Sequence, residues 1–203
     1  MALAVMAGVA SFQGQQPLSQ MVVTPEADSA WFDADTADFF PMMTSRLGSH
    51  GDTKVHPLFS LIVYPPVKVL RVVGVFTPRP AAQSLLAMGA SLWIAGFFAL
   101  LRLIGCRRLD AGLFSLLAMT SAAAMFGFVV PESFPFGAVS IVLALCVVAW
   151  SHHRGRSAAW HLLASAGTLS MTVTNWMVGL FAVFAQWPWR RALQLSVNAF
   201  CLV

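Results

Sequence analysis

Aspartates are concentrated in the one long hydrophilic segment of the chain, residues 13–54, whose centre at 31–40 reads WFDADTADFF. In a helix, Asp35 and Asp38 are three positions apart and share one face, beside aromatic side chains typical of a membrane boundary. A carboxylate held against apolar surface has a raised proton affinity, which suits a general base. Paired carboxylates could instead hold a divalent cation beside a phosphate leaving group. The alternative is a solvated acidic loop in which Asp33 or Asp35 only caps a helix.

The composition indicates a membrane protein. Of the 203 residues, 58% are hydrophobic and 10% are charged, and the mean hydropathy is +0.75. An average soluble domain has roughly a quarter charged residues, so a water-soluble globule of this composition would expose apolar surface that it could not cover. Disorder is excluded because it requires low hydrophobicity. The three cysteines are too few and too apolar in context to form a disulfide framework.

We therefore predict an all-α, polytopic transmembrane protein with an outer juxtamembrane loop between its first and second spans. A spanning helix needs about 20 apolar residues. The predicted bundle occupies residues 81–203, and its apolar runs are 81–104, 111–130, 134–150, 158–173, 176–188 and a last run, 192–203, that is cut short. The first two runs are long enough to span, the third is barely so, and the next two are short.

Charge alternates between the turns of this predicted bundle. Three turns contain arginine, namely Arg102 with Arg107 and Arg108, Arg154 with Arg156, and Arg190 with Arg191. The two turns between them, at Glu132 and Asn175, contain no Lys or Arg. Because cytoplasmic loops favour Lys and Arg, we predict that the arginine turns are cytoplasmic and that Glu132 and Asn175 face outward. The excess of basic residues is explained by these turns and does not indicate nucleic-acid binding.

Residues 55–80 are predicted to form an interfacial or re-entrant helix. Pro65 and Pro66 remove hydrogen bonds from any helix in this segment, and Lys68 and Arg71 would be costly at membrane depth. Cations to one side of an apolar stripe suit a helix that lies in the membrane interface.

The beginning of the chain is apolar but too short to span, and it lacks the basic start of a signal peptide. We interpret residues 1–12 as the outer end of a truncated first transmembrane helix and residues 13–54 as an extracytoplasmic acidic loop. Since the last apolar run also stops early, we expect the chain to be a fragment of a longer protein. The predicted location is the bacterial inner membrane.

Several short motifs occur in a characteristic order. Residues 35–39 read DTADF, residues 56–59 read HPLF, and later apolar runs end in paired arginine and in Pro-Glu at 131–132. This order resembles the GT-C class of integral-membrane glycosyltransferases, which includes protein mannosyltransferases and lipid A aminoarabinose transferases. In that class the first outer loop has Asp-Glu-Ala-x-Tyr, followed later by His-Pro-Pro-Leu-Tyr. Here Thr36 replaces the acidic second residue and one proline is absent. The resemblance covers roughly residues 25–150.

The resemblance implies transfer of a sugar from a polyprenyl-phosphate donor to an extracytoplasmic acceptor. By this resemblance, Asp35 is the base that deprotonates the acceptor hydroxyl, and Asp33 is the second choice. A lipid phosphate must meet cations at the membrane surface, and Lys54 and His56 are placed for this role, with Arg46 as a further candidate.

Glu132 would complete this site from the next outer loop, where it would steer the acceptor or a metal ion. Thr36 argues against metal binding, and His50 and His56 are poorly spaced to share a metal ion. We therefore assign no metal site and no cofactor, with a divalent cation left open. The expected partners are the lipid bilayer and a lipid-linked sugar donor, and the acceptor is undetermined.

Two other classes of function remain open. A transporter or flippase module is favoured by the short pair of runs at 158–173 and 176–188, although the acidic residues lie in a loop and not within the spans. A non-catalytic membrane subunit that presents its outer loop to a partner is the other. We expect the 203-residue chain alone to be inactive, because it would lack part of a substrate cavity.

Overall fold

The computed structural model describes residues 1–18, 36–46, 54–74 and 77–203. All regular elements within these ranges are α-helices, which confirms the predicted all-α class. In chain order they are α1 (Ala2–Leu18), α2 (Thr36–Thr44), α3 (Phe59–Gly74), α4 (Pro78–Leu103), α5 (Arg108–Met119), α6 (Ala122–Gly127), α7 (Phe134–Arg154), α8 (Ala158–Met171), α9 (Trp176–Gln186) and α10 (Trp189–Leu202).

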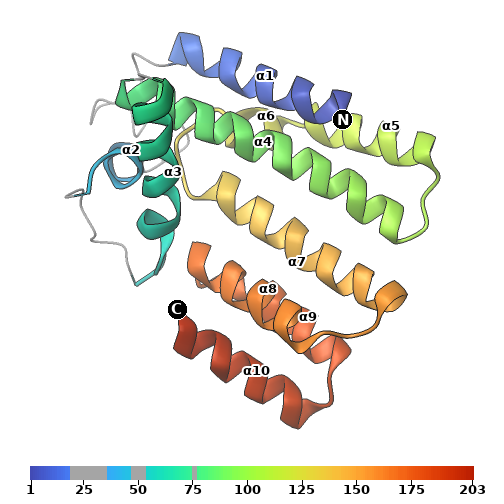
Figure 1. The fold of residues 1–203 in the computed structure, drawn as a ribbon. Coiled ribbons are helices and arrows are strands. Elements are labelled where there is room, and N and C mark those ends of the chain that lie inside the picture. Colours follow the sequence, from blue (N-terminus) through green and yellow to red (C-terminus); the bar gives the residue numbers. More distant parts are fainter. Residues whose placement is uncertain (19–35, 47–53, 75–76) are drawn as a thin grey trace.

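The longer helices lie side by side in a stack (Figure 1). α4 packs between α1 and α7, α7 packs against α8, and both α9 and α10 pack against α8. From α7 onward, successive helices run in opposite directions, so their connections collect at the two ends of the stack. α2 and α3 lie across one of these ends, where their buried side chains join those of the first turns of α4 in one apolar cluster.

The turns that differ in charge lie at opposite ends of the stack (Figure 1). One end, which we call the His56 end, holds residues 55–58, 128–133 and 172–175, which share hydrogen bonds and a cavity wall. The other, which we call the arginine end, holds the turns 104–107, 155–157 and 187–188. Glu132 and Asn175 thus lie together, away from the paired arginines.

The predicted run 111–130 is two helices in the structure, so the prediction of a single helix there was wrong. α5 ends and α6 begins on either side of Thr120 and Ser121. Both hydroxyls donate to carbonyl groups of the preceding turn, at 3.1 and 2.7 Å, and Ser121 Oγ also accepts the N–H of Ala124. Such side-chain bonds compete with the helix backbone and explain the break. The remaining runs correspond to α4, α7, α8, α9 and α10 with shifted ends.

Helical structure also extends into the hydrophilic segment that we had predicted as a loop over 13–54. α1 continues past residue 12 to Leu18, and α2 lies within the segment. Two polar residues of α1 are buried and bonded: Ser11 Oγ donates to the carbonyl of Phe128 at 2.6 Å, and Gln15 Nε2 donates to that of Gln83 at 3.3 Å. Because these side chains find partners on α4 and after α6, the helix does not need to end where the apolar run ends.

α3 lies across the stack and not along it (Figure 1), and it continues through Pro65 and Pro66. Its buried side consists of Phe59, Val63 and Val67, whereas other apolar residues of the same helix are exposed. A helix across one end with an exposed apolar side has the geometry of a helix in a membrane interface.

Within the described residues, two helices, α4 and α7, are long and apolar enough to cross a membrane. Only 28% of the most apolar 18-residue stretch of each is buried, whereas the core helix of a soluble protein is buried over most of its surface. Large hydrophobic side chains are exposed along the stack, including Leu92 on α4, Leu143 on α7 and Phe181 on α9. These features favour association with a membrane.

α8 and α9 approach each other closely at Gly179. A methyl group on Gly179 would lie 2.8 Å from Cα of Ser165 and would also meet Oγ1 of Thr168. Trp176 Nε1 donates to Ser165 Oγ at 3.0 Å and holds the pair of helices in this register. Because a backbone atom cannot move aside as the end of a side chain can, this contact requires glycine.

We predict that Gly179→Ala destabilises the protein by about 1–3 kcal/mol, because the added methyl group pushes α8 and α9 apart. Thermal loss of helicity in detergent micelles measures the effect. Gly167→Ala on α8 is the matched control, since its added methyl group meets no atom within 4 Å, and alanine raises helix propensity. Equal melting temperatures for the two variants would contradict the proposed close packing.

Candidate functional site

Residues 55–58 lie between the hydrophilic segment and α3, and hydrogen bonds join them to the end of α8. The Leu58 amide donates to the carbonyl of Ser170 at 3.2 Å, and the Val173 amide donates to that of Val55 at 3.0 Å. His56 Nδ1 lies 2.8 Å from the carbonyl oxygen of Met171, the last residue of α8. Because a carbonyl only accepts, Nδ1 carries the proton and Nε2 is left for another partner.

Aromatic rings fix the His56 imidazole from the other side. The ring of Phe39 on α2 meets that of His56 edge to face at 5.1 Å and meets Phe59 in the same way at 5.1 Å. Phe59 in turn contacts Phe136 of α7 at 5.7 Å. Edge-to-face aromatic pairs of this kind hold the rings in fixed directions, so His56 is positioned by α2, α7 and α8 together.

His56 lines two cavities. The first, which we call the Arg46 cavity, has a volume of about 370 Å³ and is lined by Ser45, Arg46, His56, Pro57, Ser60, Leu61 and Tyr64. A guanidinium group, an imidazole and several hydroxyls are donors suited to phosphate oxygens. Leu61 beside them is 68% exposed, so an apolar chain attached to such a phosphate would also find a contact.

The second cavity, which we call the Asn175 cavity, has a volume of about 220 Å³. Its polar wall consists of His56, Ser133, Thr172, Thr174 and Asn175. Hydroxyls and an amide can donate and accept hydrogen bonds, which suits a ligand with several hydroxyl groups. His56 is therefore the residue shared by a cationic cavity and a neutral polar one.

The structure unites some of the predicted site residues and leaves others apart. Arg46 and His56 line one cavity. Lys54 is exposed and lines neither cavity. Glu132 is only 4% exposed, and its neighbour Ser133 lines the Asn175 cavity. The predicted base positions, 33 and 35, lie outside the described residues.

Ser60, Tyr64 and Thr172 line these cavities but were not predicted as site residues from the sequence. Tyr64 is the one tyrosine of the chain and follows Ser60 by four positions, so the two share a face of α3. That spacing predicts a polar face on α3, but it does not indicate a binding site until Arg46 is known to lie beside α3.

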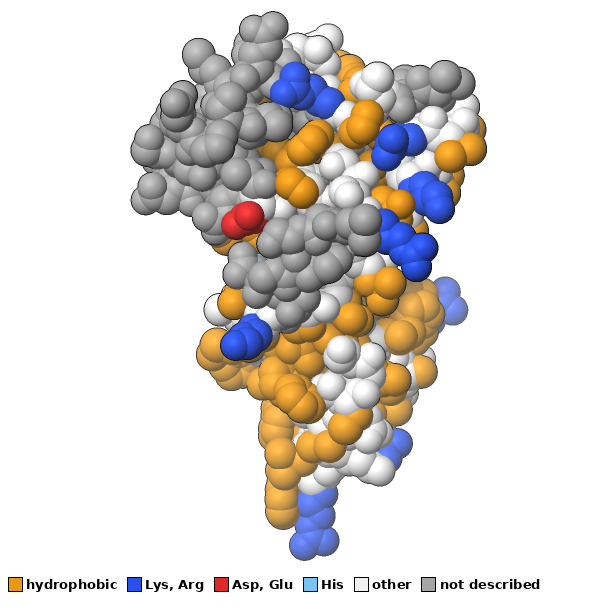
Figure 2. All heavy atoms as spheres, turned by 90° about the vertical axis from the view of Figure 1, so that its left-hand side faces the viewer, with side chains coloured by type: hydrophobic (Ala, Val, Ile, Leu, Met, Phe, Trp, Pro, Cys, Tyr) orange, Lys and Arg blue, Asp and Glu red, His pale blue; other side chains and the backbone are white. Residues whose placement is uncertain are grey.

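Figure 2 views the molecule onto the His56 end. Basic side chains are spread over this face among hydrophobic ones, with a small acidic area. α3 contributes Lys68 and Arg71, and Arg79 lies at the start of α4. A surface that combines cations with exposed apolar groups is suited to lipid phosphates and their chains.

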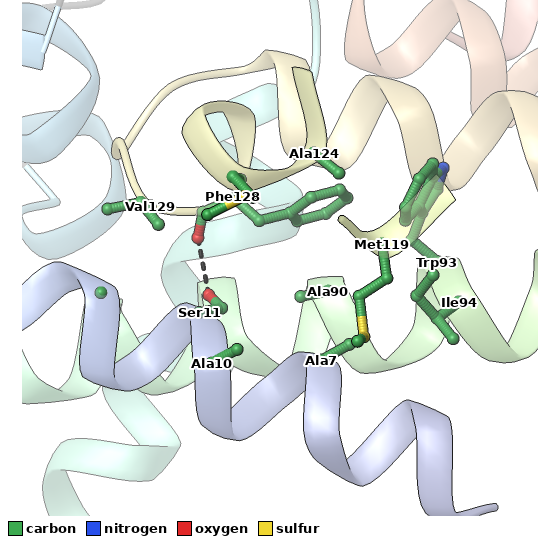
Figure 3. Close-up of a pocket in the computed structure, with 12 residues that line it drawn as sticks. Ala7, Ala10, Ser11, Ala90, Trp93, Ile94, Met119, Ala124, Phe128 and Val129 are labelled. Carbon is green, nitrogen blue, oxygen red and sulfur yellow. Dashed lines mark hydrogen bonds between the residues drawn. The ribbon is translucent and has the colours of Figure 1, made fainter. Parts of the chain in front are cut away.

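A third cavity, of about 130 Å³, lies between α1, α4 and the α5–α6 break (Figure 3). Its wall is almost entirely apolar, and the rings of Trp93 and Phe128 lie 5.2 Å apart within it. The hydroxyl of Ser11 is already bonded to the Phe128 carbonyl. This cavity therefore offers apolar contact and no reactive group.

Among the described residues, no three His, Cys, Asp or Glu side chains gather closely enough to hold a metal ion. No family model matches the chain, and none of the curated proteins or solved structures compared with it is significantly similar. The functional conclusion therefore depends on the site itself.

We predict that His56→Phe loosens the connection between residues 55–58 and α8. The phenylalanine ring keeps the aromatic contacts but cannot bond to the Met171 carbonyl. Loss of this bond, worth about 1 kcal/mol, raises local hydrogen-exchange rates roughly fivefold. Hydrogen exchange at the Leu58 and Val173 amides measures this. His153→Phe is the control, because His153 makes an equivalent 2.8 Å contact with the Leu103 carbonyl at the arginine end. Unchanged exchange at Leu58 and Val173 would show that His56 does not fasten this segment.

Proposed function

We propose that the protein is a multi-pass membrane protein of the bacterial inner membrane that binds a polyprenyl-phosphate-linked sugar at its His56 end. The sugar is then transferred to an acceptor outside the cytoplasm, as in the GT-C class that the sequence motifs resemble. The His56 end faces the extracytoplasmic side and the arginine end faces the cytoplasm, in keeping with the preference of cytoplasmic loops for arginine.

One observation carries this proposal: Arg46 and His56, from separate segments, line a single cavity beside exposed apolar surface. The volume of about 370 Å³ is within the range of small-ligand sites, roughly 300–1,000 Å³. Arg46 and Tyr64 would hold the phosphate, Leu61 would meet the first part of the lipid chain, and the neighbouring Asn175 cavity would hold the sugar hydroxyls. His56 lies between the two groups that must separate.

The base of the proposed reaction is Asp35, with Asp33 as the second choice. A base near the acceptor hydroxyl removes its proton as the new glycosidic bond forms, while the lipid phosphate leaves with the bonding electron pair. Arg46 and His56 would stabilise the negative charge that develops on the leaving phosphate. Lys54, two residues before His56, would add positive charge at the mouth of the site.

We predict that two kinds of variant change different kinetic constants of sugar transfer. Arg46→Gln raises the KM for the donor about tenfold, because one charge-assisted contact with phosphate is lost. Asp35→Asn lowers kcat by about 10²-fold or more, since a general base is lost. Transfer from radiolabelled polyprenyl-phosphate sugars to membrane acceptors measures both constants, in the natural full-length protein if the gene is longer.

Arg79→Gln is the control, because Arg79 lies at the same end of the molecule but lines neither cavity. If Asp33→Asn, Asp35→Asn and the double variant all keep full activity, the proposed base is wrong. If Arg46→Gln and Arg79→Gln behave alike, the Arg46 cavity is not the donor site.

We predict that positions 35 and 106 lie on opposite sides of the membrane. Cys106 belongs to the first arginine turn, so it is a native probe of that end. In a background without Cys146 and Cys201, a membrane-impermeant maleimide applied to intact cells should label Asp35→Cys and spare Cys106. Labelling of both before permeabilisation would overturn the proposed sidedness.

A transporter is a second candidate, because the break between α5 and α6 resembles the discontinuous helices of many transporters. The buried residue Ser11 of α1 lines the cavity beside that break. Substrate-dependent uptake into liposomes, without sugar transfer, would favour this function over the first.

A further inference from the structure

A cavity of about 160 Å³ lies at the arginine end, between the last turns of α7 and the start of α8. Trp150, Ser151 and Arg154 line it from α7, and Ser157 and Trp160 line it from the other side. It is far from the His56 end and plays no part in the function proposed above. Its wall combines a cation, two hydroxyls and two large aromatic rings.

The turn between the two helices brings Arg154 and Ser157 to this cavity. Gly155 has a φ of +87°, a backbone conformation that residues with a side chain rarely adopt. This glycine allows the chain to reverse direction within a few residues. Ser157 occupies the N-cap position of α8, but its side chain makes no capping hydrogen bond. The Ser157 hydroxyl therefore remains for another partner.

Arg154 differs from Arg156 and Arg191, two other arginines at this end. Arg156 donates to the Gln186 carbonyl at 2.6 Å, and Arg191 donates to Gln194 Oε1 at 2.6 Å. Among the residues that the structure describes, Arg154 has no hydrogen-bond partner, although it lines the cavity. The Ser151 hydroxyl already donates to the Val147 carbonyl at 2.7 Å, so the donors that remain are the Arg154 guanidinium and the Ser157 hydroxyl. Together they are suited to the oxygens of a phosphate group.

The aromatic rings indicate the depth of the site and the nature of its ligand. Trp150 and Trp160 are 49% and 55% exposed, and their rings stack with centroids 6.4 Å apart. Tryptophan favours the level of the lipid headgroups. Val147, which lies about 10 Å along α7 from Arg154 by helical rise, lines the same cavity. The cavity is therefore polar near Arg154 and apolar near Val147, which suits a lipid with a polar headgroup and an acyl chain.

We propose that this cavity binds the phosphate group of an anionic phospholipid at the cytoplasmic surface of the membrane. Arg154 and Ser157 hold the phosphate oxygens, and the two tryptophans flank the glycerol and the first part of the acyl chain. Basic pockets between helices at this level bind anionic headgroups. The inference rests on the membrane embedding proposed above but not on sugar transfer.

The test reconstitutes the full chain in nanodiscs with equal amounts of phosphatidylglycerol and phosphatidylcholine. Native mass spectrometry after detergent extraction then counts the retained lipids. The wild-type chain should retain phosphatidylglycerol, and Arg154→Gln should lower that retention roughly tenfold. Arg154→Lys should keep an intermediate level, because it keeps the charge. Arg190→Gln should match the wild type, since Arg190 packs over Trp189 and does not line the cavity.

Several results would overturn the inference. If Arg154→Gln and Arg190→Gln lower retention equally, the effect is general surface charge. If millimolar inorganic phosphate displaces the lipid, the site binds free phosphate. A chain that inserts into the nanodisc without preferring phosphatidylglycerol refutes only this inference. A chain that does not insert at all refutes it together with the proposed membrane embedding. Circular dichroism of each variant verifies that the helices remain folded.

Discussion

The last carbonyl groups of a helix have no partner within that helix, and in this protein side chains from other elements supply the missing donors. Among the described residues, five helix ends are satisfied in this way: Met171 of α8 by His56, Leu103 of α4 by His153, Gln186 of α9 by Arg156, Thr44 of α2 by Arg71, and Phe128 after α6 by Ser11. An unsatisfied carbonyl in apolar surroundings costs several kcal/mol. Each of these bonds ties two segments that are distant in sequence, so the arrangement of the helices depends on them.

The same bonds place the two polar sites. Because His56 is fastened to the end of α8, it stands between a cavity that contains Arg46 and one that contains Asn175. At the arginine end, Arg156 is used to hold the end of α9, whereas Arg154 lines a cavity. Neighbouring arginines thus differ in what they contact: one is bonded to a helix end, and the other borders a cavity.

Between the two ends the helices are held by close packing together with a few polar bonds, such as the one from Trp176 of α9 to Ser165 of α8 and the one from Cys146 Sγ of α7 to the Gly96 carbonyl of α4. Gly96 of α4 faces Val142 of α7 at 2.9 Å from its would-be Cβ, and Gly179 brings α9 against α8 in the same manner. Small residues allow this approach, which is the main source of attraction between helices surrounded by lipid. Larger apolar side chains are left to point outward, where a bilayer would cover them.

The sequence by itself determined the all-α class, most of the helices and the separation of the arginine turns from Glu132 and Asn175. These properties follow from composition, from the length of apolar runs and from charge near the turns, all of which act locally along the chain. The helix break at Thr120 and Ser121 is also a local effect, because two adjacent hydroxyls bond to the preceding turn. It was not predicted, because the residues on both sides form one continuous apolar run.

Only the tertiary structure decided which polar groups meet. Arg46 and His56 share a cavity because α2 and α3 pack together across the end of the stack, and Tyr64 joins them from α3. The bond between His56 and Met171 joins residues 115 positions apart. No local pattern predicts such a pair, because its energy comes from a buried carbonyl that needs a donor and accepts one from any segment the fold brings near.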